Sequence, residues 1–298
     1  MDIFIQTIAS SILVGALYGL VTLGLGLLMG VMKFLNVAHG TFIVLGGYVS
    51  YWLFTLLGVN PYLSTPLVVI VMFVVGLGVY RLTLAPLLEL PSIGRRISSS
   101  MLVTFGIIYV LDNLMTALWK PDVRSIITPY SLQSLDVLGV KLSVTGLYGF
   151  AIAILVAVVL YLVLSWTQFG KHVRAATEDA EAASLCGINV HRTYLISSGI
   201  AIALAGIAGT IVVSSLSISP NSGLSWLLTA FVVMVLAGEG NLNGIIPAGL
   251  ALGLIEGIAV TIVGPSYRQA VALIVFILIL LVRAWHEEPE GDKQIDAA

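Results

Sequence analysis

Side chains that could do chemistry are concentrated in three short stretches of a chain that is otherwise almost entirely apolar. The stretch 170–192, GKHVRAATEDAEAASLCGINVHR, is the longest interruption by charge. The stretch 34–47, FLNVAHGTFIVLGG, holds an asparagine and a histidine among glycines, and 237–257, AGEGNLNGIIPAGLALGLIEG, holds two carboxylates and two asparagines. Polar groups within apolar helices must face protein or water, where they can contact a solute. These stretches are therefore the candidate functional regions.

The stretches 34–47 and 237–257 are candidates for lining a solute pathway. In each of them a break rich in asparagine and glycine precedes a helix of small residues, and paired breaks of this kind indicate a duplicated transporter with its pathway between the repeats. An imidazole such as that of His39 is more often a structural group at a helix end, and we weigh that role above a direct one. The pathway candidates are Asn36, His39, Gly40, Gly46, Gly47, Glu239, Asn241 and Asn243.

Glu256 lies well inside the apolar run 245–263. A carboxylate within a membrane span costs about 2–4 kcal/mol, so it must face protein or water or be protonated. We expect it to pair with a neighbouring helix, with a pathway role as the alternative. No metal site is expected, because no ligand-type residue lies near His39 in the sequence and Cys186 is the single cysteine.

Several chemistries are absent from the sequence. No G-x-x-x-x-G-K-S/T loop occurs, so we expect no ATP hydrolysis of that type by this chain. No Ser/His/Asp or Cys/His arrangement indicates nucleophilic catalysis, and no row of acidic residues indicates a cation channel. The net charge of −2, without a basic stripe, argues against nucleic acid as a partner. The chain is thus predicted to be no enzyme and to bind no cofactor of its own.

Composition indicates the elements that position these residues. The 298 residues are 59% hydrophobic and 9% charged, whereas soluble domains carry about 25% charged residues. Lipid must therefore solvate most of the chain, and we predict an all-α polytopic membrane protein. Apolar runs lie at 3–30, 40–57, 61–85, 98–118, 144–166, 193–216, 226–238, 245–263 and 268–284. They give eight or nine crossings with broken segments and an internal repeat, since the run 226–238 is short enough to be re-entrant.

The basic residues predict the orientation of the chain. Lys33, the segment 81–96, the stretch 170–192 and the tail after Arg283 place nine of the thirteen Lys and Arg residues on one side, which is then cytoplasmic. Lys120, Arg124, Lys141 and Arg268 are left outside. We expect residues 1–284 to form one membrane domain in the cell's inner (plasma) membrane, and residues 285–298 to form a polar cytoplasmic tail.

The stretch 170–192 has the pattern of a short helix. Its alanines favour a helix, and Arg174 and Glu178 are spaced one turn apart, where they can pair. Gly187 stands where a left-handed cap would end the helix. A face of small side chains would let another protein approach closely, although a solvated connector is an equally good interpretation of the pattern alone. That small-residue face consists of Val173, Ala176, Ala180 and Ala183.

Two of these segments resemble a known family. The junction NVAHG at 36–40 resembles the Asn–Phe/Met–Ala–His–Gly junction of branched-chain amino acid ABC importer permeases. The stretch RAATEDAEAASLCGIN at 174–189 resembles that family's R-A-x-x-E-D-x-x-x-A-x-x-x-G-I-N segment, which is the more specific of the two. The order of the remaining segments is similar over nearly the whole chain. One departure is Glu239, where the family commonly has an apolar residue within a glycine-rich break.

The resemblance implies a transmembrane subunit of an ATP-driven importer. Its partners would be a second, homologous permease, two cytoplasmic ATPase subunits that bind ATP and magnesium, and an extracytoplasmic solute-binding protein. The loop would couple the permease to an ATPase subunit through Arg174, Glu178, Asp179, Glu181, Ala182, Ala183 and Gly187.

Branched-chain or other hydrophobic amino acids are the expected solutes. Urea, short amides or another small organic solute remain the alternative within the same family. A self-sufficient secondary transporter or channel is the remoter alternative.

Overall fold

The computed structural model describes residues 2–90, 92–137, 139–238 and 240–286. The candidate residue Glu239 and the tail residues 287–298 lie outside the described residues. Within the described ranges, nine helical spans are long and apolar enough to cross a membrane. The prediction of an all-α polytopic membrane protein is confirmed, and the count agrees with the larger of the two expected numbers. The spanning helices are α1 (Asp2–Met32), α2 (His39–Leu57), α3 (Pro61–Val79), α4 (Ile93–Trp119), α5 (Val144–Trp166), α8 (Val190–Ser215), α9 (Gly223–Ala237), α10 (Ile245–Val263) and α11 (Arg268–His286).

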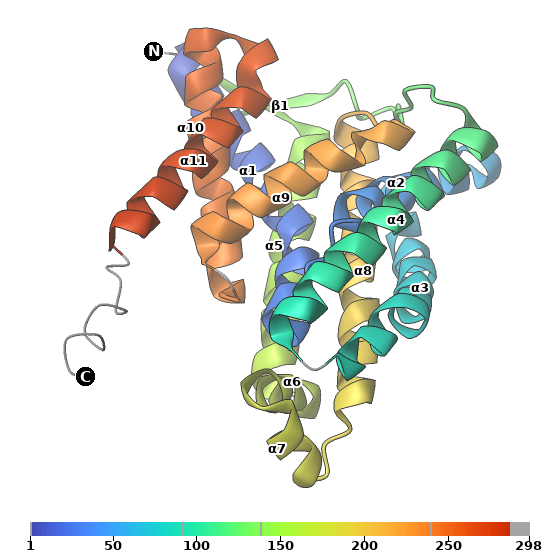
Figure 1. Cartoon of the computed structure of the whole chain (residues 1–298). Coiled ribbons are helices and arrows are strands. Elements are labelled where there is room, and N and C mark those ends of the chain that lie inside the picture. Colours follow the sequence, from blue (N-terminus) through green and yellow to red (C-terminus); the bar gives the residue numbers. More distant parts are fainter. Residues whose placement is uncertain (1, 91, 138, 239, 287–298) are drawn as a thin grey trace.

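Shorter elements join the spans. A hairpin of β1 (Ser134–Val137) and β2 (Val140–Ser143) precedes α5, and the helices α6 (Gln168–Glu178) and α7 (Ala180–Leu185) lie at the opposite end of the molecule (Figure 1). One short π-helix and four short 3-10 helices complete the connections in the described ranges. They are Tyr80–Leu84, Ala85–Glu89, Pro220–Ser222, Leu242–Gly244 and Pro265–Tyr267.

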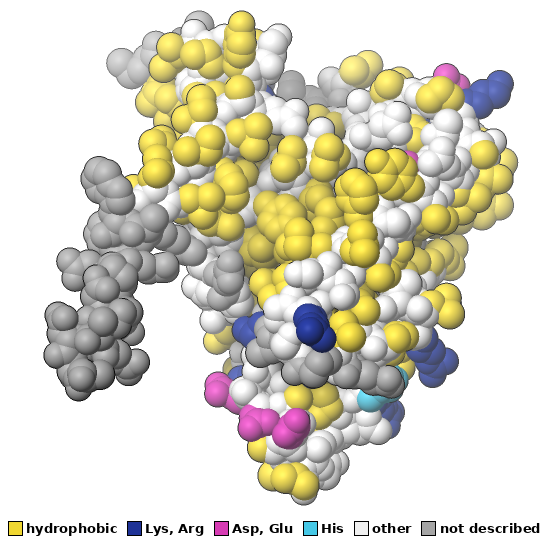
Figure 2. Space-filling model, viewed as in Figure 1, with side chains coloured by type: hydrophobic (Ala, Val, Ile, Leu, Met, Phe, Trp, Pro, Cys, Tyr) yellow, Lys and Arg dark blue, Asp and Glu magenta, His cyan; other side chains and the backbone are white. Residues whose placement is uncertain are grey.

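Helices α1 and α8 form the centre of the bundle. Within their most apolar stretches 78% and 83% of the residues are buried, against 11% in α4 and 6% in α11. The outer helices therefore turn apolar side chains outward, and Figure 2 shows many hydrophobic side chains and few charged ones on the visible surface between the two ends. Such a surface is stable in lipid and not in water.

Glycines bring α1 and α10 into backbone contact. A Cβ added at Gly249 would lie 2.5 Å from the amide nitrogen of Gly19, and one at Gly253 would lie 2.5 Å from Cα of Gly15. Small residues allow such packing in lipid, where no hydrophobic force drives helices together. Close packing of the two helices therefore accounts for these glycines.

The connection from α8 to α9 is the broken segment of the fold. A Cβ added at Gly47 of α2 would lie 3.1 Å from Ile218, and Gly40, near the start of α2, packs against the backbone of Gly223. Residues 216–222 therefore run alongside α2, from Gly47 toward Gly40, before α9 begins. The run expected at 226–238 is accordingly a helix of 15 residues, preceded by a mainly non-helical segment that packs against α2.

Hydrogen bonds join separate parts of the chain at the end that carries the hairpin. The Gln6 side chain near the start of α1 donates to the Lys141 carbonyl at 2.6 Å and accepts from the Lys141 amide at 2.8 Å. Arg124 and Ile218 exchange two backbone hydrogen bonds, both of 2.8 Å. The orientation predicted from the basic residues puts this end outside the cell and α6 and α7 inside, so the two ends are called outer and inner below.

Candidate functional site

The charged stretch forms two helices rather than the single helix expected from its alanines. The Thr167 hydroxyl caps α6 by accepting from the Gly170 amide at 3.2 Å. The Asp179 carboxylate then caps α7 by accepting from the amides of Glu181 at 2.9 Å and Ala182 at 3.0 Å. Capping of this kind is worth about 1 kcal/mol and fixes where a helix begins. Residues 168–185 therefore form two helices joined by a bend at Asp179, called the α6–α7 elbow here.

The end of the elbow agrees with the prediction for Gly187. This glycine has φ 83°, and the amide of Ile188 donates to the Ala183 carbonyl at 3.1 Å. A left-handed residue with this hydrogen bond is the usual termination that glycine allows. The Asn189 side chain accepts from the Arg192 amide at 2.8 Å and starts α8 directly afterwards.

The small-residue face points into the molecule, which corrects the expectation that it faces a partner. Val173, Ala176 and Ala183 are buried within this chain and Ala180 is partly buried, and the Tyr194 hydroxyl donates to the Ala176 carbonyl at 3.2 Å. The face lets the elbow pack against its own bundle. The predicted Arg174–Glu178 pair is also wrong, because the Arg174 guanidinium donates to the Leu164 carbonyl of α5 instead.

The outward surface of the elbow carries the carboxylates of Glu178, Asp179 and Glu181, the basic side chains of Lys171 and Arg174, and one large apolar side chain. Leu185 is 89% exposed at the end of α7, and Figure 2 shows acidic side chains gathered at the inner end, where the elbow lies. Sequence reasoning overlooked Leu185, although a leucine within a charged, exposed stretch is a usable signal. Six of the residues that were predicted for coupling are also exposed: Arg174, Glu178, Asp179, Glu181, Ala182 and Gly187.

The first break, between α1 and α2, is held by internal hydrogen bonds. His39 is fully buried, and its Nε2 donates to the Val21 carbonyl of α1 at 3.0 Å. Asn36 is buried and accepts from the Ala38 amide at 3.1 Å, while the Val37 amide donates to a hydroxyl of α4 at 3.1 Å. These contacts agree with the structural role that we weighed above a direct one for His39.

The glycines of the first break lie in helix contacts. A Cβ added at Gly46 would lie 2.5 Å from Cα of Gly206 in α8, and Gly40 and Gly47 pack against the backbone near the start of α9 and against α8. Close packing accounts for all three in this conformation. Their place on a solute pathway stays a prediction.

The second break adjoins the elbow across a cavity of about 840 Å³ at the inner end. Asn241 and Asn243 line it together with Arg174 and Glu178 of α6, and Gly30 of α1 lies on the same wall. Gly240 of the break lies directly against Gly30, since a Cβ added at Gly30 would be 3.6 Å from its Cα. This inner cavity brings residues predicted for coupling together with residues predicted for the pathway.

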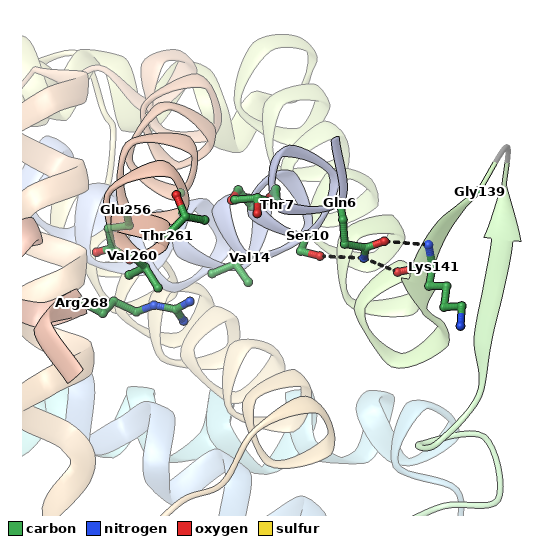
Figure 3. Close-up of a pocket in the computed structure, with 13 residues that line it drawn as sticks. Gln6, Thr7, Ser10, Val14, Gly139, Lys141, Glu256, Val260, Thr261 and Arg268 are labelled. Carbon is green, nitrogen blue, oxygen red and sulfur yellow. Dashed lines mark hydrogen bonds between the residues drawn. The ribbon is translucent and has the colours of Figure 1, made fainter. Parts of the chain in front are cut away.

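Glu256 lies in a second cavity, of about 450 Å³, at the outer end (Figure 3). Its carboxylate is 3% exposed and accepts a hydrogen bond of 2.7 Å from the Tyr18 hydroxyl of α1. The expected pairing with a neighbouring helix is thus present. This outer cavity is also lined by Gln6, Thr7, Ser10, Ser11, Val14, Gly139, Lys141, Gly253, Gly257, Val260, Thr261 and Arg268.

Comparison with known proteins gives the same family as the sequence motifs. The family model described as branched-chain amino acid transport system / permease component matches residues 7–280. The high-affinity branched-chain amino acid transport system permease protein BraD of Pseudomonas aeruginosa is 27% identical over 94% of both chains.

Two further relatives carry similar names. The probable branched-chain amino acid transport permease protein LivH of Methanocaldococcus jannaschii is 28% identical over 88% of this chain and 85% of its own. The high-affinity branched-chain amino acid transport system permease protein LivH of Escherichia coli is 25% identical over 94% and 93%. No solved structure matches the chain. Because the family model spans nearly its whole length, this chain belongs to the branched-chain amino acid transport system permease component family.

Proposed function

We propose that this chain is the transmembrane subunit of an ATP-driven importer of branched-chain or other hydrophobic amino acids in the inner membrane. Its partners are a second, homologous permease, two cytoplasmic ATPase subunits that hold ATP and magnesium, and an extracytoplasmic solute-binding protein. The observation that carries the proposal is the α6–α7 elbow, an exposed and internally braced element on an otherwise apolar membrane chain.

The elbow is suited to receive force from an ATPase subunit. Leu185 offers an apolar anchor for a groove, and the carboxylates of Glu178 and Glu181 can fix the register against basic groups on the partner. Because α6 is tied to α5 through Arg174 and to α8 through Tyr194, a push on the elbow moves those helices with it.

The inner cavity offers a route from that push to the pathway. One wall is α6, which moves with the ATPase, and another is the second break with Asn241 and Asn243. Displacing α6 relative to this break would open or close the inner end of the bundle. Alternating access requires such a two-state element, and ATP binding and hydrolysis on the ATPase subunits would bias it.

The names of the relatives and the apolar interior favour hydrophobic amino acids as the solutes. Urea, short amides or another small organic solute form the second candidate, because the break at 238–244 departs from the family's usual glycine pattern. A gradient-driven secondary transporter is the third.

Reconstitution of the assembly tests this proposal. Vesicles containing both permeases, with ATPase subunits and ATP inside and binding protein outside for inward transport, are expected to accumulate labelled leucine, isoleucine and valine. Omission of any one component should abolish uptake. Accumulation of urea or acetamide in place of the amino acids would overturn the substrate assignment.

A further inference from the structure

The outer cavity holds a buried carboxylate and a cationic side chain where α1, α10 and α11 meet. Glu256 of α10 is largely buried but lines the cavity, and one of its oxygens accepts from the Tyr18 hydroxyl, while Arg268, the first residue of α11, lines the same cavity. Figure 3 shows the Arg268 side chain extending from α11 beneath Val260, on the side of the cavity where Val14 of α1 also lies. Opposite charges are thus available within one small cavity.

The wall around Glu256 is rich in hydrogen-bond acceptors. The Ser11 hydroxyl donates to the Thr7 carbonyl at 2.7 Å, and the Thr261 hydroxyl donates to the Ile258 carbonyl at 2.6 Å. A hydroxyl has one proton and two lone pairs, so each of these groups can still accept but no longer donate. Together with the Glu256 carboxylate they suit an ammonium group, which has three donors and no acceptor.

Arg268 gives the cavity a cationic side chain, and a guanidinium binds a carboxylate through two parallel hydrogen bonds. Val14 and Val260 supply an apolar surface in the same cavity. The volume of about 450 Å³ lies within the range of roughly 300–1,000 Å³ typical of small-molecule sites.

We propose that the outer cavity binds a free α-amino acid with an apolar side chain. The ammonium group lies at Glu256, the carboxylate at Arg268, and the side chain against Val14 and Val260. The inference rests on the proposed function for the class of solute, and it adds the site on this chain that receives the amino acid from the outer side. Glu256 then has a binding role beyond the helix pairing expected from the sequence.

Equilibrium binding of labelled leucine tests the site. The measurement uses the complete assembly in nanodiscs without ATP and without the binding protein. Glu256→Gln and Arg268→Gln should each weaken binding about tenfold or more, because each removes one partner of a charged hydrogen-bonded pair. Arg268→Lys should retain part of the affinity. Lys120→Gln, which removes an outer-end cation that does not line the cavity, should bind as the wild type does.

Two analogues of leucine separate ligand binding from a purely structural ion pair. The keto acid of leucine lacks the ammonium group, and isoamylamine lacks the carboxylate. In the wild type neither should displace labelled leucine at concentrations where isoleucine does. In Glu256→Gln the preference for leucine over its keto acid should fall, which a loss of helix pairing alone would not produce. Should Glu256→Gln fail to fold, the Arg268 variants and the wild-type competition still decide the matter.

Different experimental results would overturn the binding site and the proposed function. Wild-type leucine affinity in both Glu256→Gln and Arg268→Gln, in an assembly that imports leucine with ATP, would overturn this site alone. Displacement of leucine by the keto acid as effectively as by isoleucine would overturn it as well. An assembly that imports urea or amides and no amino acid would instead overturn the proposed substrate class.

Discussion

Replacement of Leu185 by alanine tests the docking role of the α6–α7 elbow. The side chain is 89% exposed, so its loss should leave the fold of this chain almost unchanged. The change removes three carbon atoms. At about 0.8 kcal/mol per buried methylene-sized group, full burial in a partner's groove makes them worth about 2 kcal/mol. Since about 1.4 kcal/mol is a tenfold change, the ATPase should bind roughly 30-fold more weakly.

The assay is a titration of the permease pair in nanodiscs with a fluorescently labelled ATPase subunit. Leu132→Ala is the matched control, since Leu132 is 92% exposed in the outer loop and undergoes the same substitution at the opposite end of the molecule. The ATPase affinity of this control should equal that of the wild type. An unchanged affinity in Leu185→Ala would refute the anchor role, and an equal loss in both variants would show that the effect is not one of docking.

Two further predictions concern the fold around the functional regions. Asp179→Ala should destabilise α7 by about 1 kcal/mol through loss of its cap, with Asp179→Asn largely restoring it, and hydrogen exchange of the α7 amides measures the difference. Equal exchange in both variants would refute the capping role. Gly24→Ala should lower the melting temperature in detergent, because the added methyl would lie 2.7 Å from the His39 ring and overpacking costs about 1–3 kcal/mol. Gly106→Ala is the matched control, since nothing lies within 4 Å of its added Cβ, and a comparable loss there would contradict the packing argument.

The helices were predictable because their cause is local in the sequence. A run of apolar residues long enough to span lipid can satisfy its backbone only as a helix, so nine runs became nine spanning segments among the described residues. Gly187 was predictable for a similar reason, since the left-handed conformation that ends the elbow strongly favours glycine. The signal in both cases lies within a few neighbouring residues.

The sequence did not predict which face of the elbow packs against the bundle and which face is exposed. Helical periodicity places Val173, Ala176 and Ala183 on one face, but it does not say whether that face meets the chain's own bundle or another protein. The answer depends on α8, whose Tyr194 reaches the elbow. The break into two helices was also missed, because capping by Asp179 outweighs the helical preference of the surrounding alanines.

The two cavities could not be predicted from sequence either. Glu256 and Tyr18 are 238 positions apart, and Gly30 and Gly240 are similarly distant, so only the packing of α1 against its neighbours brings them together. Arg268 was noted as one of the outer-side cations, and its place in one cavity with a buried carboxylate follows from the turn between α10 and α11. Long-range juxtaposition of this kind leaves no local pattern.

The most direct test of the account is the energy source for leucine uptake by the reconstituted assembly. With ATP, the binding protein and ionophores that abolish proton and sodium gradients, uptake should continue at its full initial rate, and without ATP it should stop. Accumulation of leucine by this chain alone, driven by a proton or sodium gradient, would contradict the account.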